Sequence, residues 1–431
     1  MKYLLIVTCL VTTILTSCKE SNSNDDPSDV QTIRTVLVYM AGENNLTNYE
    51  GVRFLRNDLT EIIEGSKLLS NNERMLVFVD SLNDRKKTGT PAIIEVRNGT
   101  TTVLHQYDND FYSCDPANFK EVLQTMVKKA PAQSYGLILW GHASGWIVSN
   151  DTIEGSRQTR AYGQDIGTDH SSNSPKWMNI TQMARALKEL PKMEFIFADC
   201  CNMMCAEVGY ELRDVTNYLI GSPAEIPGDG APYTELTPSF FKNGSQLYKG
   251  IIDTYYNEYL EAFKGDGFLE GFSVPLSVID TKHMEELAQA THDILYKFVG
   301  GYPSYPKAPD FSNTVYYYYF DAPLMYDMRA FIKLNTSEED FLHWDNVFKQ
   351  AVPYYRMSIR WMTINDYLEW AMTKFNQDDS VNGCVSMFIP QNLQVYYNGT
   401  FHYNKTFNNF GWNRVIDWSR YGWTPETTFS R

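Results

Sequence analysis

Four short segments of this chain are apolar at nearly every position, and segments with a helical spacing of apolar residues separate them. The four expected strands cover residues 35–42, 75–81, 135–140 and 193–200. A strand with two apolar faces needs cover on both sides of its sheet, and alternation with helices makes such a sheet mostly parallel. The sequence therefore predicts the α/β class, with a mostly parallel sheet flanked by helices on both faces.

The intervening pattern predicts helices at 49–69, from Pro116 onward, at 180–190 and at 205–215, with one more strand at 218–222. An alternating segment, 92–107, is divided by Asn98-Gly99 and predicts a hairpin. Past residue 240 the chain is aromatic and less regular, with helices expected near 246–263 and 281–298 and strands at 315–321 and 383–390. No repeat or linker is visible, so residues 241–431 are expected to form an aromatic-rich α+β part packed on the core, 32–240.

The N-terminus is typical of an exported protein. Lys2 precedes an apolar stretch that ends at Leu15, which is too short to span a membrane and predicts a signal peptide, 1–17. Cys18 follows in a setting that resembles the bacterial lipoprotein box, although a plain signal with a chance cysteine is the alternative. The polar residues 18–31 predict a flexible tether. We therefore expect a lipid-anchored protein at the outer membrane or cell surface.

The net charge of −15 arises from 37 basic and 52 acidic residues, without a basic stripe. Such a surface repels nucleic acid and anionic lipid, so no nucleic-acid partner is expected, and contact with membrane is expected only through the lipid anchor. An acidic surface is usual for solubility, and it also favours cationic substrates.

Five cysteines remain once Cys9 and Cys18 are set aside: Cys114, Cys200, Cys201, Cys205 and Cys384. An odd number with three clustered is not a disulfide framework. The cluster lacks the spacing and the nearby histidine of a zinc site, so no metal ligands are expected. A nucleophilic thiol and a Cys201–Cys205 disulfide both remain open.

A histidine and the clustered thiols follow two of the expected strands. His142 comes directly after the strand 135–140, and Cys201 lies 59 residues later, after the strand 193–200. Ligand sites in parallel sheets lie beyond the carboxyl ends of the strands. An imidazole there can accept the proton of a thiol, although a structural histidine at a strand end is the alternative.

The stretches "LILWGHASGW" and "FADCCNMMCAEVGYE" resemble the clostripain family of cysteine peptidases, which are caspase-like enzymes that cleave after Arg or Lys. Further similar stretches are "TVLVYMAGENNL", "GSPAEIPGDGAPY", "GCVSMFIP" and "FNNFGWNRVIDW", so the resemblance covers nearly all of the mature chain. It implies a caspase-like sheet, Cys201 as nucleophile and His142 as its base. Cys200 falls where the family has alanine. The resemblance implies protein or peptide substrates. It leaves open whether this chain needs calcium as a cofactor, since some relatives require it.

Two residues depart from the family pattern. Ala143 stands where the family has glycine, and its backbone N–H is expected to form the oxyanion hole with that of Cys201. Glu43 replaces an aspartate in the first-strand motif. These departures leave open a weakly active or inactive lipoprotein that binds peptide or glycan, for which 29 tyrosines and nine tryptophans would suit stacking.

Specificity for Arg or Lys requires a carboxylate in the substrate pocket, and Asp199 and Asp229 are the candidates. The alternatives are a loop-holding hydrogen bond for Asp199 and a turn position for Asp229. The polar segment 147–177 is expected to be an exposed loop, and the family resemblance implies self-cleavage in it, after Arg160 first and Arg157 second. A loop that is never cut is the alternative.

Overall fold

The computed structural model describes residues 32–82, 89–147, 162–167, 175–300, 309–312, 314–320, 322–323, 325–365, 370–374, 381–389 and 410–418. All of them belong to one compact unit, Thr32–Arg431. The predicted signal peptide, the tether and Cys18 lie outside the described residues. Within the described part of the chain, none of the helices combines the length and the apolar character needed to cross a bilayer.

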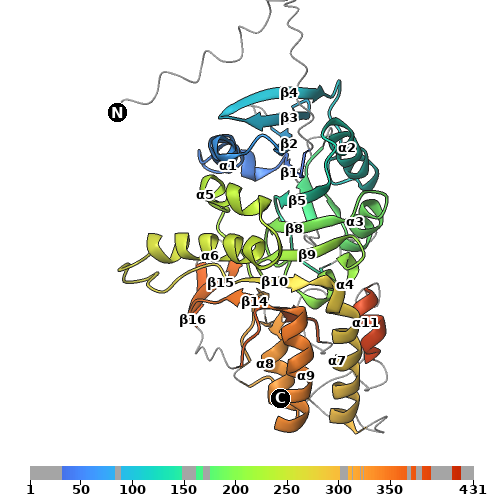
Figure 1. Ribbon diagram of the computed structural model, residues 1–431. Helices are drawn as coiled ribbons and strands as arrows, with labels where there is room; N and C mark the ends of the chain where they lie inside the picture. Colours follow the sequence, from blue (N-terminus) through green and yellow to red (C-terminus); the bar gives the residue numbers. More distant parts are fainter. Residues whose placement is uncertain are drawn as a thin grey trace, which may run out of the picture. The chain divides into compact units, whose positions relative to one another are not determined.

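The centre of the unit is a nine-stranded sheet (Figure 1). Its five inner strands are parallel, in the order β9 (Thr216–Gly221), β8 (Met193–Asp199), β5 (Ser134–Trp140), β1 (Arg34–Gly42) and β2 (Glu73–Ser81). Antiparallel strands extend both edges: β3 (Ala92–Arg97) and β4 (Thr100–Gln106) beyond β2, and β10 (Leu276–Asp280) and β14 (Tyr354–Arg356) beyond β9. The predicted mostly parallel α/β sheet is confirmed.

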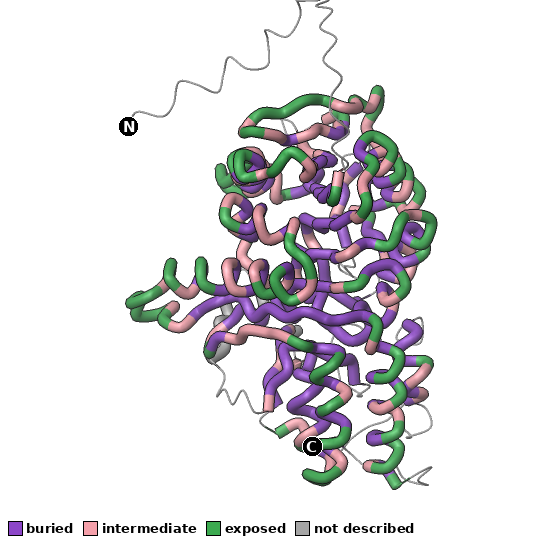
Figure 2. Tube along the Cα trace, viewed as in Figure 1, coloured by how far each residue is buried: buried purple, intermediate pink, exposed green. Residues whose placement is uncertain are grey.

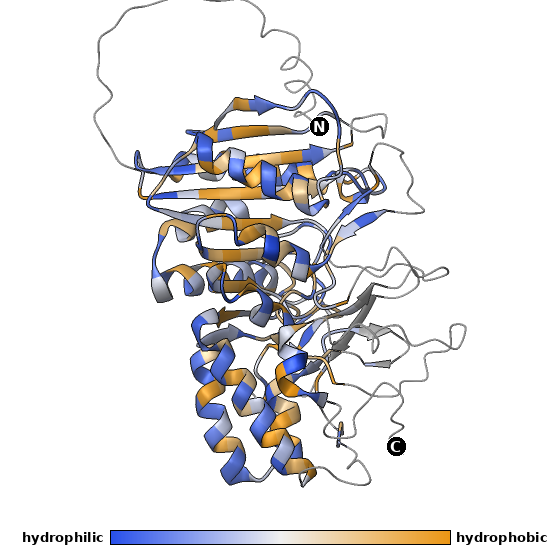
Figure 3. Cartoon of the chain, turned by 90° about the vertical axis from the view of Figure 1, so that its right-hand side faces the viewer, coloured by the Kyte–Doolittle hydropathy of each residue, from blue (hydrophilic) through white to orange (hydrophobic). Residues whose placement is uncertain are grey.

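Helices cover both faces of this sheet (Figure 1). One face carries α1 (Phe54–Gly65), α5 (Tyr233–Leu236) and α6 (Gly244–Ala262), and the other carries α2 (Pro116–Lys129), α3 (Ile180–Leu187), α4 (Ala206–Leu212) and α7 (Met284–Val299). Because successive side chains of a strand point to opposite faces, β1 serves two cores at once. Val36 and Val38 enter one core, and Leu37 and Tyr39 enter the other. The inner strands are accordingly the most continuously buried part of the unit, whereas the edge strand β4 is largely exposed (Figures 2 and 3).

The helices of the C-terminal part are α8 (Met328–Asn335), α9 (Glu338–Ala351) and α11 (Gly411–Ile416). Its short strands form antiparallel pairs: β11 (Tyr319–Phe320) with β12 (Ala322–Pro323), β13 (Tyr326–Asp327) with β17 (Ser386–Met387), and β15 (Arg360–Asn365) with β16 (Trp370–Lys374). The strand predicted at 315–321 is present only as β11, and the one at 383–390 only as β17. Ser386 and Phe388 nonetheless contact the core: their backbone N–H groups donate to Met204 O at 3.0 Å and to Glu207 Oε1 at 2.9 Å.

The helix expected at 205–215 is present as α4, which begins at Ala206 with Cys205 as its N-cap residue. One local prediction needs correction. The segment 147–177 is not an exposed loop throughout, because β6 (Tyr162–Asp165) lies within it and pairs antiparallel with β7 (Lys176–Met178) at its end. Tyr162 and Asp165 are fully buried. Arg157 and Arg160 lie outside the described residues.

Candidate active site

Two loops meet at the carboxyl ends of β5 and β8. These strands are parallel neighbours, and Trp140 at the end of β5 is in register with Asp199 at the end of β8. His142 and Cys201 each follow two residues beyond this matched pair. Because adjacent strands lie about 4.8 Å apart, the histidine loop and the cysteine loop leave the sheet side by side.

The imidazole of His142 is held by Asn45. Its Nε2 lies 2.7 Å from Asn45 Oδ1, in the short 3-10 helix Asn45–Thr47 that follows β1. An amide oxygen only accepts hydrogen bonds, so this contact needs the proton on Nε2 and makes Nδ1 the basic nitrogen of the neutral ring. The backbone is fixed as well, since Gly163 N donates to His142 O at 2.9 Å. Sequence analysis did not single out Asn45, although the pair Asn44-Asn45 directly follows the first strand and could have indicated a polar side chain at the site.

The cysteine loop separates the clustered thiols by exposure. None of the five cysteines in the described part of the chain forms a disulfide, and Cys201 is half-buried while the other four are buried. Burial raises the pKa of the Cys200 and Cys205 thiols well above the usual value, which disfavours their thiolates. Cys201 Sγ instead accepts a hydrogen bond from Ile226 N at 3.4 Å. Among the described cysteines, Cys201 therefore has the access and setting that a nucleophile needs.

The two loops touch at Gly145, which has a positive φ of 59°. A Cβ at this position would lie 2.3 Å from Asn202 O and 3.2 Å from Cys205 Sγ. Asn202 also has a positive φ of 59°, and its N–H donates to Ala224 O at 2.9 Å. Glycine thus allows the histidine loop to pack directly on the backbone of the cysteine loop.

Ala143 does not require the backbone freedom of the glycine that it replaces. Its φ is not positive. Its side chain is buried in the same core as Tyr162, and the backbones of the two residues form an antiparallel β-bridge. The substitution therefore adds no backbone strain at the histidine loop. The N–H groups of Ala143 and Cys201 remain a prediction as the oxyanion hole.

The carboxylate of Asp199 is more enclosed than an open pocket floor would be. Its oxygens accept hydrogen bonds from Tyr233 Oη at 2.8 Å, Tyr255 Oη at 3.1 Å and Ala231 N at 3.2 Å, and the residue is 3% exposed. Burial raises the pKa of Asp199 to about 6, against the opposing effect of these hydrogen bonds. The bonds fit the loop-holding alternative for Asp199, while Asp229 lies exposed in the adjacent turn.

Asp58 is a further carboxylate at this site that sequence analysis missed. It is fully buried in α1 and accepts a hydrogen bond from Trp140 Nε1 at 2.5 Å. Burial, followed by the charge of Asp199, raises the pKa of Asp58 to about 9. A Cβ on Gly230 would lie 2.7 Å from Asp58 Oδ2 and 3.1 Å from Asp199 Oδ2, so both carboxylates border the turn that carries Asp229. In the sequence, Asp58 could have been recognised as an acidic residue on the apolar face of the α1 helix, between Leu55 and Ile62.

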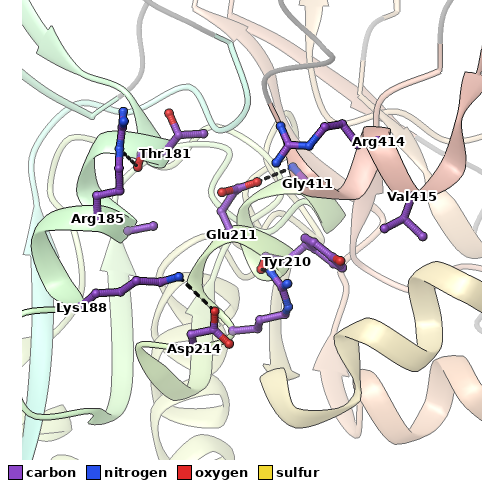
Figure 4. A pocket seen from close by; sticks show the side chains of 11 residues that line it. Thr181, Arg185, Lys188, Tyr210, Glu211, Asp214, Gly411, Arg414 and Val415 are labelled. Carbon is purple, nitrogen blue, oxygen red and sulfur yellow. Dashed lines mark hydrogen bonds and ion pairs between the residues drawn. The ribbon is translucent and has the colours of Figure 1, made fainter.

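A surface pocket lies elsewhere, between α3, α4 and the start of α11 (Figure 4). Its charged side chains are engaged locally: Lys188 pairs with Asp214 at 3.2 Å, and Arg185 Nε donates to Thr181 O at 3.1 Å. None of the candidate site residues lines it.

Among the described residues, no group of cysteines and histidines could hold a metal ion. The carboxylates of Glu43, Asp80 and Asp165 lie close enough together to do so.

Comparisons with known proteins agree with this geometry. The model of the Clostripain family matches residues 38–423. The chain is 29% identical to a secreted C11 cysteine protease from Bacteroides thetaiotaomicron, solved with an irreversible peptide inhibitor, over 90% of this chain and 99% of that one, with a TM-score of 0.70. An inactive zymogen C11 protease from Parabacteroides distasonis is 23% identical over the same shares, with a TM-score of 0.69. The comparison with curated proteins gave no match.

Proposed function

Because this chain belongs to the clostripain family of cysteine peptidases, we propose that it cleaves proteins after Arg or Lys, with Cys201 as nucleophile and His142 as general base. The observation that carries the proposal is the position of Cys201. It is the half-buried thiol among the five described cysteines, on a loop that leaves the sheet beside the loop of His142.

In the proposed reaction, Nδ1 of His142 takes the proton of the Cys201 thiol, and the thiolate attacks the carbonyl carbon of the scissile peptide bond. The N–H groups of Ala143 and Cys201 stabilise the oxyanion that forms. The imidazolium then returns its proton to the leaving amine as the C–N bond breaks, which leaves a thioester. Water, deprotonated by His142, hydrolyses the thioester and restores the thiol. Asn45 acts as a positioning residue, since it fixes the ring and its tautomer.

The carboxylates beside the site support specificity for a cationic side chain. Among the described residues, no Lys or Arg forms an ion pair with Asp58, Asp199 or Asp229. With a pKa of about 6, Asp199 is ionised at neutral pH. We propose that Asp199 and Asp229 attract the Arg or Lys side chain and that the neighbouring tyrosines order the pocket wall.

The test uses fluorogenic peptides that differ only in Arg, Lys or Leu before the cleaved bond, together with an alkylating peptide ending in Arg. We expect cleavage of the Arg and Lys peptides, little cleavage of the Leu peptide, and a single alkylated site at Cys201 by peptide mass mapping. Alkylation at Cys200 or equal cleavage of all three peptides would contradict the proposal.

Self-cleavage after Arg160, and second after Arg157, is proposed as the maturation step. Both residues lie outside the described residues, but β6 begins at Tyr162, two positions after Arg160. A cut before Ala161 would thus free the loop while Gly163 keeps its hydrogen bond to His142 O. We expect intact mass spectrometry to find two chains in the wild type and one in Cys201→Ala. A wild type that is fully active as a single chain would contradict self-maturation.

Lipid attachment at Cys18 is proposed as the anchor that holds the peptidase at the outer membrane or cell surface. The support comes from the sequence of residues 1–31, with its short apolar segment and polar tether. We expect the full-length chain to enter the detergent phase on phase separation and Cys18→Ala to stay in the aqueous phase. Equal partitioning of the two proteins would contradict the anchor.

A further inference from the structure

A short segment of the C-terminal part, residues 386–388, runs parallel to the end of the cysteine loop. Ser386 and Cys205 form a parallel β-bridge, and Ser386 N donates to Met204 O at 3.0 Å. The main chain turns away from this segment where α4 begins, since the carbonyl of Cys205 accepts the first hydrogen bond of the helix. Two residues further along, Phe388 N therefore meets a side chain of the first helical turn.

The side chain that Phe388 N meets is that of Glu207. Glu207 is fully buried, and its Oε1 accepts the hydrogen bond at 2.9 Å. Burying this acid costs free energy, since Oε2 has no hydrogen-bond partner among the described residues. Burial also raises the pKa of Glu207 to about 7. The protonated and the ionised carboxyl group both keep an acceptor oxygen, so the bond to Phe388 N persists in either form.

Phe388 continues this connection to the histidine loop. Its ring lies 4.6 Å, between ring centres, from the ring of Trp146, and both side chains are buried. Trp146 follows Gly145, the glycine that packs on the backbone of Asn202. The histidine loop is therefore held at two adjacent residues, by the cysteine loop at Gly145 and by Phe388 at Trp146.

We propose that Glu207 is a positioning residue of the peptidase, whose carboxyl group holds the histidine loop against the cysteine loop through Phe388 and Trp146. The inference rests on the proposed roles of His142 and Cys201. It gives Glu207 no contact with the substrate and no proton to transfer. The bond to Phe388 N fixes where the ring of Phe388 lies, so its loss should displace Trp146, four residues after His142, and the imidazole with it.

Glu207→Ala removes the acceptor and should lower kcat for the Arg peptide by about 10²-fold, because a small displacement of the catalytic groups slows the chemical step steeply. KM should change by no more than about twofold, since Asp199 makes its hydrogen bonds to Tyr233 and Tyr255 on the opposite face of the sheet. Glu207→Gln keeps an acceptor oxygen at the same position and should restore kcat to within a few-fold of the wild type. A Glu207→Gln variant as slow as Glu207→Ala would overturn the proposal.

Glu211→Ala is the matched control for this measurement. Glu211 lies one turn further along the same helix and also accepts a hydrogen bond from a backbone N–H of the C-terminal part, that of Gly411. Gly411 begins α11, which packs on α4 and α7. Both alanine variants should lower the melting temperature, because each leaves a backbone N–H without its acceptor. Only Glu207→Ala should lower kcat, and an equal kcat in the two variants would show a merely structural role and overturn the proposal.

A second measurement does not depend on peptidase activity. Added to Cys201→Ala, Glu207→Ala should speed hydrogen exchange in peptides that cover residues 141–147 and 384–389, whereas Glu211→Ala should leave exchange there unchanged. Unchanged exchange of 141–147 in the Glu207→Ala protein would overturn the positioning role. A wild type that leaves the Arg peptide intact would contradict the proposed function instead, so the two failures are distinguishable.

Phe388→Leu tests the same connection if Glu207→Ala does not fold. It keeps the backbone bond to Glu207 and removes the ring contact with Trp146. We expect kcat to fall by about 10-fold with KM unchanged, because the histidine loop then loses one of its two supports. An unchanged kcat in a folded Phe388→Leu protein would overturn the proposal.

Discussion

Replacing Cys201 by alanine is expected to lower kcat/KM for an Arg peptide by about 10⁴-fold or more, because no covalent thioester can then form. His142→Ala should cause a loss of similar size, since the thiol then lacks its base. The kcat/KM of the double variant should be no lower than that of the less active single variant, because residues that act together in one step do not contribute additively. The measurement is single-turnover cleavage with active-site titration.

Cys200→Ala is the matched control for this result. Cys200 is adjacent in sequence but fully buried, so its replacement changes packing and leaves the accessible thiol in place. We expect kcat/KM within a few-fold of the wild type and full alkylation at Cys201. Loss of all alkylation in Cys200→Ala, with an unchanged melting temperature, would show that the wrong thiol has been assigned.

Replacing Asp199 by asparagine is expected to lower kcat/KM for the Arg peptide by about 10²-fold while changing cleavage of a Leu peptide far less, because an enclosed charge partner is lost. The comparison of two peptides is needed, since Asp199 also accepts hydrogen bonds from Tyr233 and Tyr255, and a structural defect would slow both reactions. Asp229→Asn should show the same pattern with a smaller effect, since Asp229 is exposed.

The pH profile gives the same hypothesis a second readout. Because the pKa of Asp199 is about 6, its carboxylate becomes protonated as the pH falls below that value. The ratio of kcat/KM for Arg over Leu should therefore decrease from pH 7 to pH 5 in the wild type and stay flat in Asp199→Asn. If both Asn variants keep the full preference for Arg, the specificity pocket lies elsewhere.

The sequence is sufficient to predict those parts of the molecule in which the local pattern of apolar residues also determines where a segment lies in the fold. A strand such as 193–199 must be covered on both faces because it is largely apolar, and its end then marks the sheet edge where a ligand site is found. For that reason the candidate loops of His142 and Cys201 could be located before the structure was known.

The remainder depends on contacts between distant segments, which leave no periodic signal. Asp58 is placed by Trp140, 82 positions away, and Asn45 by His142, 97 positions away. The aromatic stretch near 317 looks like a strand, but Tyr317 is used as a buried packing residue, 5.5 Å between ring centres from Trp361. In such cases burial of the side chain, rather than backbone propensity, decides the structure.

The contact between the cysteine loop and the C-terminal part has a consequence for synthesis of the enzyme. Met204 O accepts its hydrogen bond from a residue 182 positions later, and Glu207 from one 181 positions later. A ribosome or an export channel releases the chain from its N-terminus, so residues 386 and 388 emerge long after the strands that carry His142 and Cys201. The cysteine loop and the start of α4 can therefore gain these two hydrogen bonds only after most of the chain has been released.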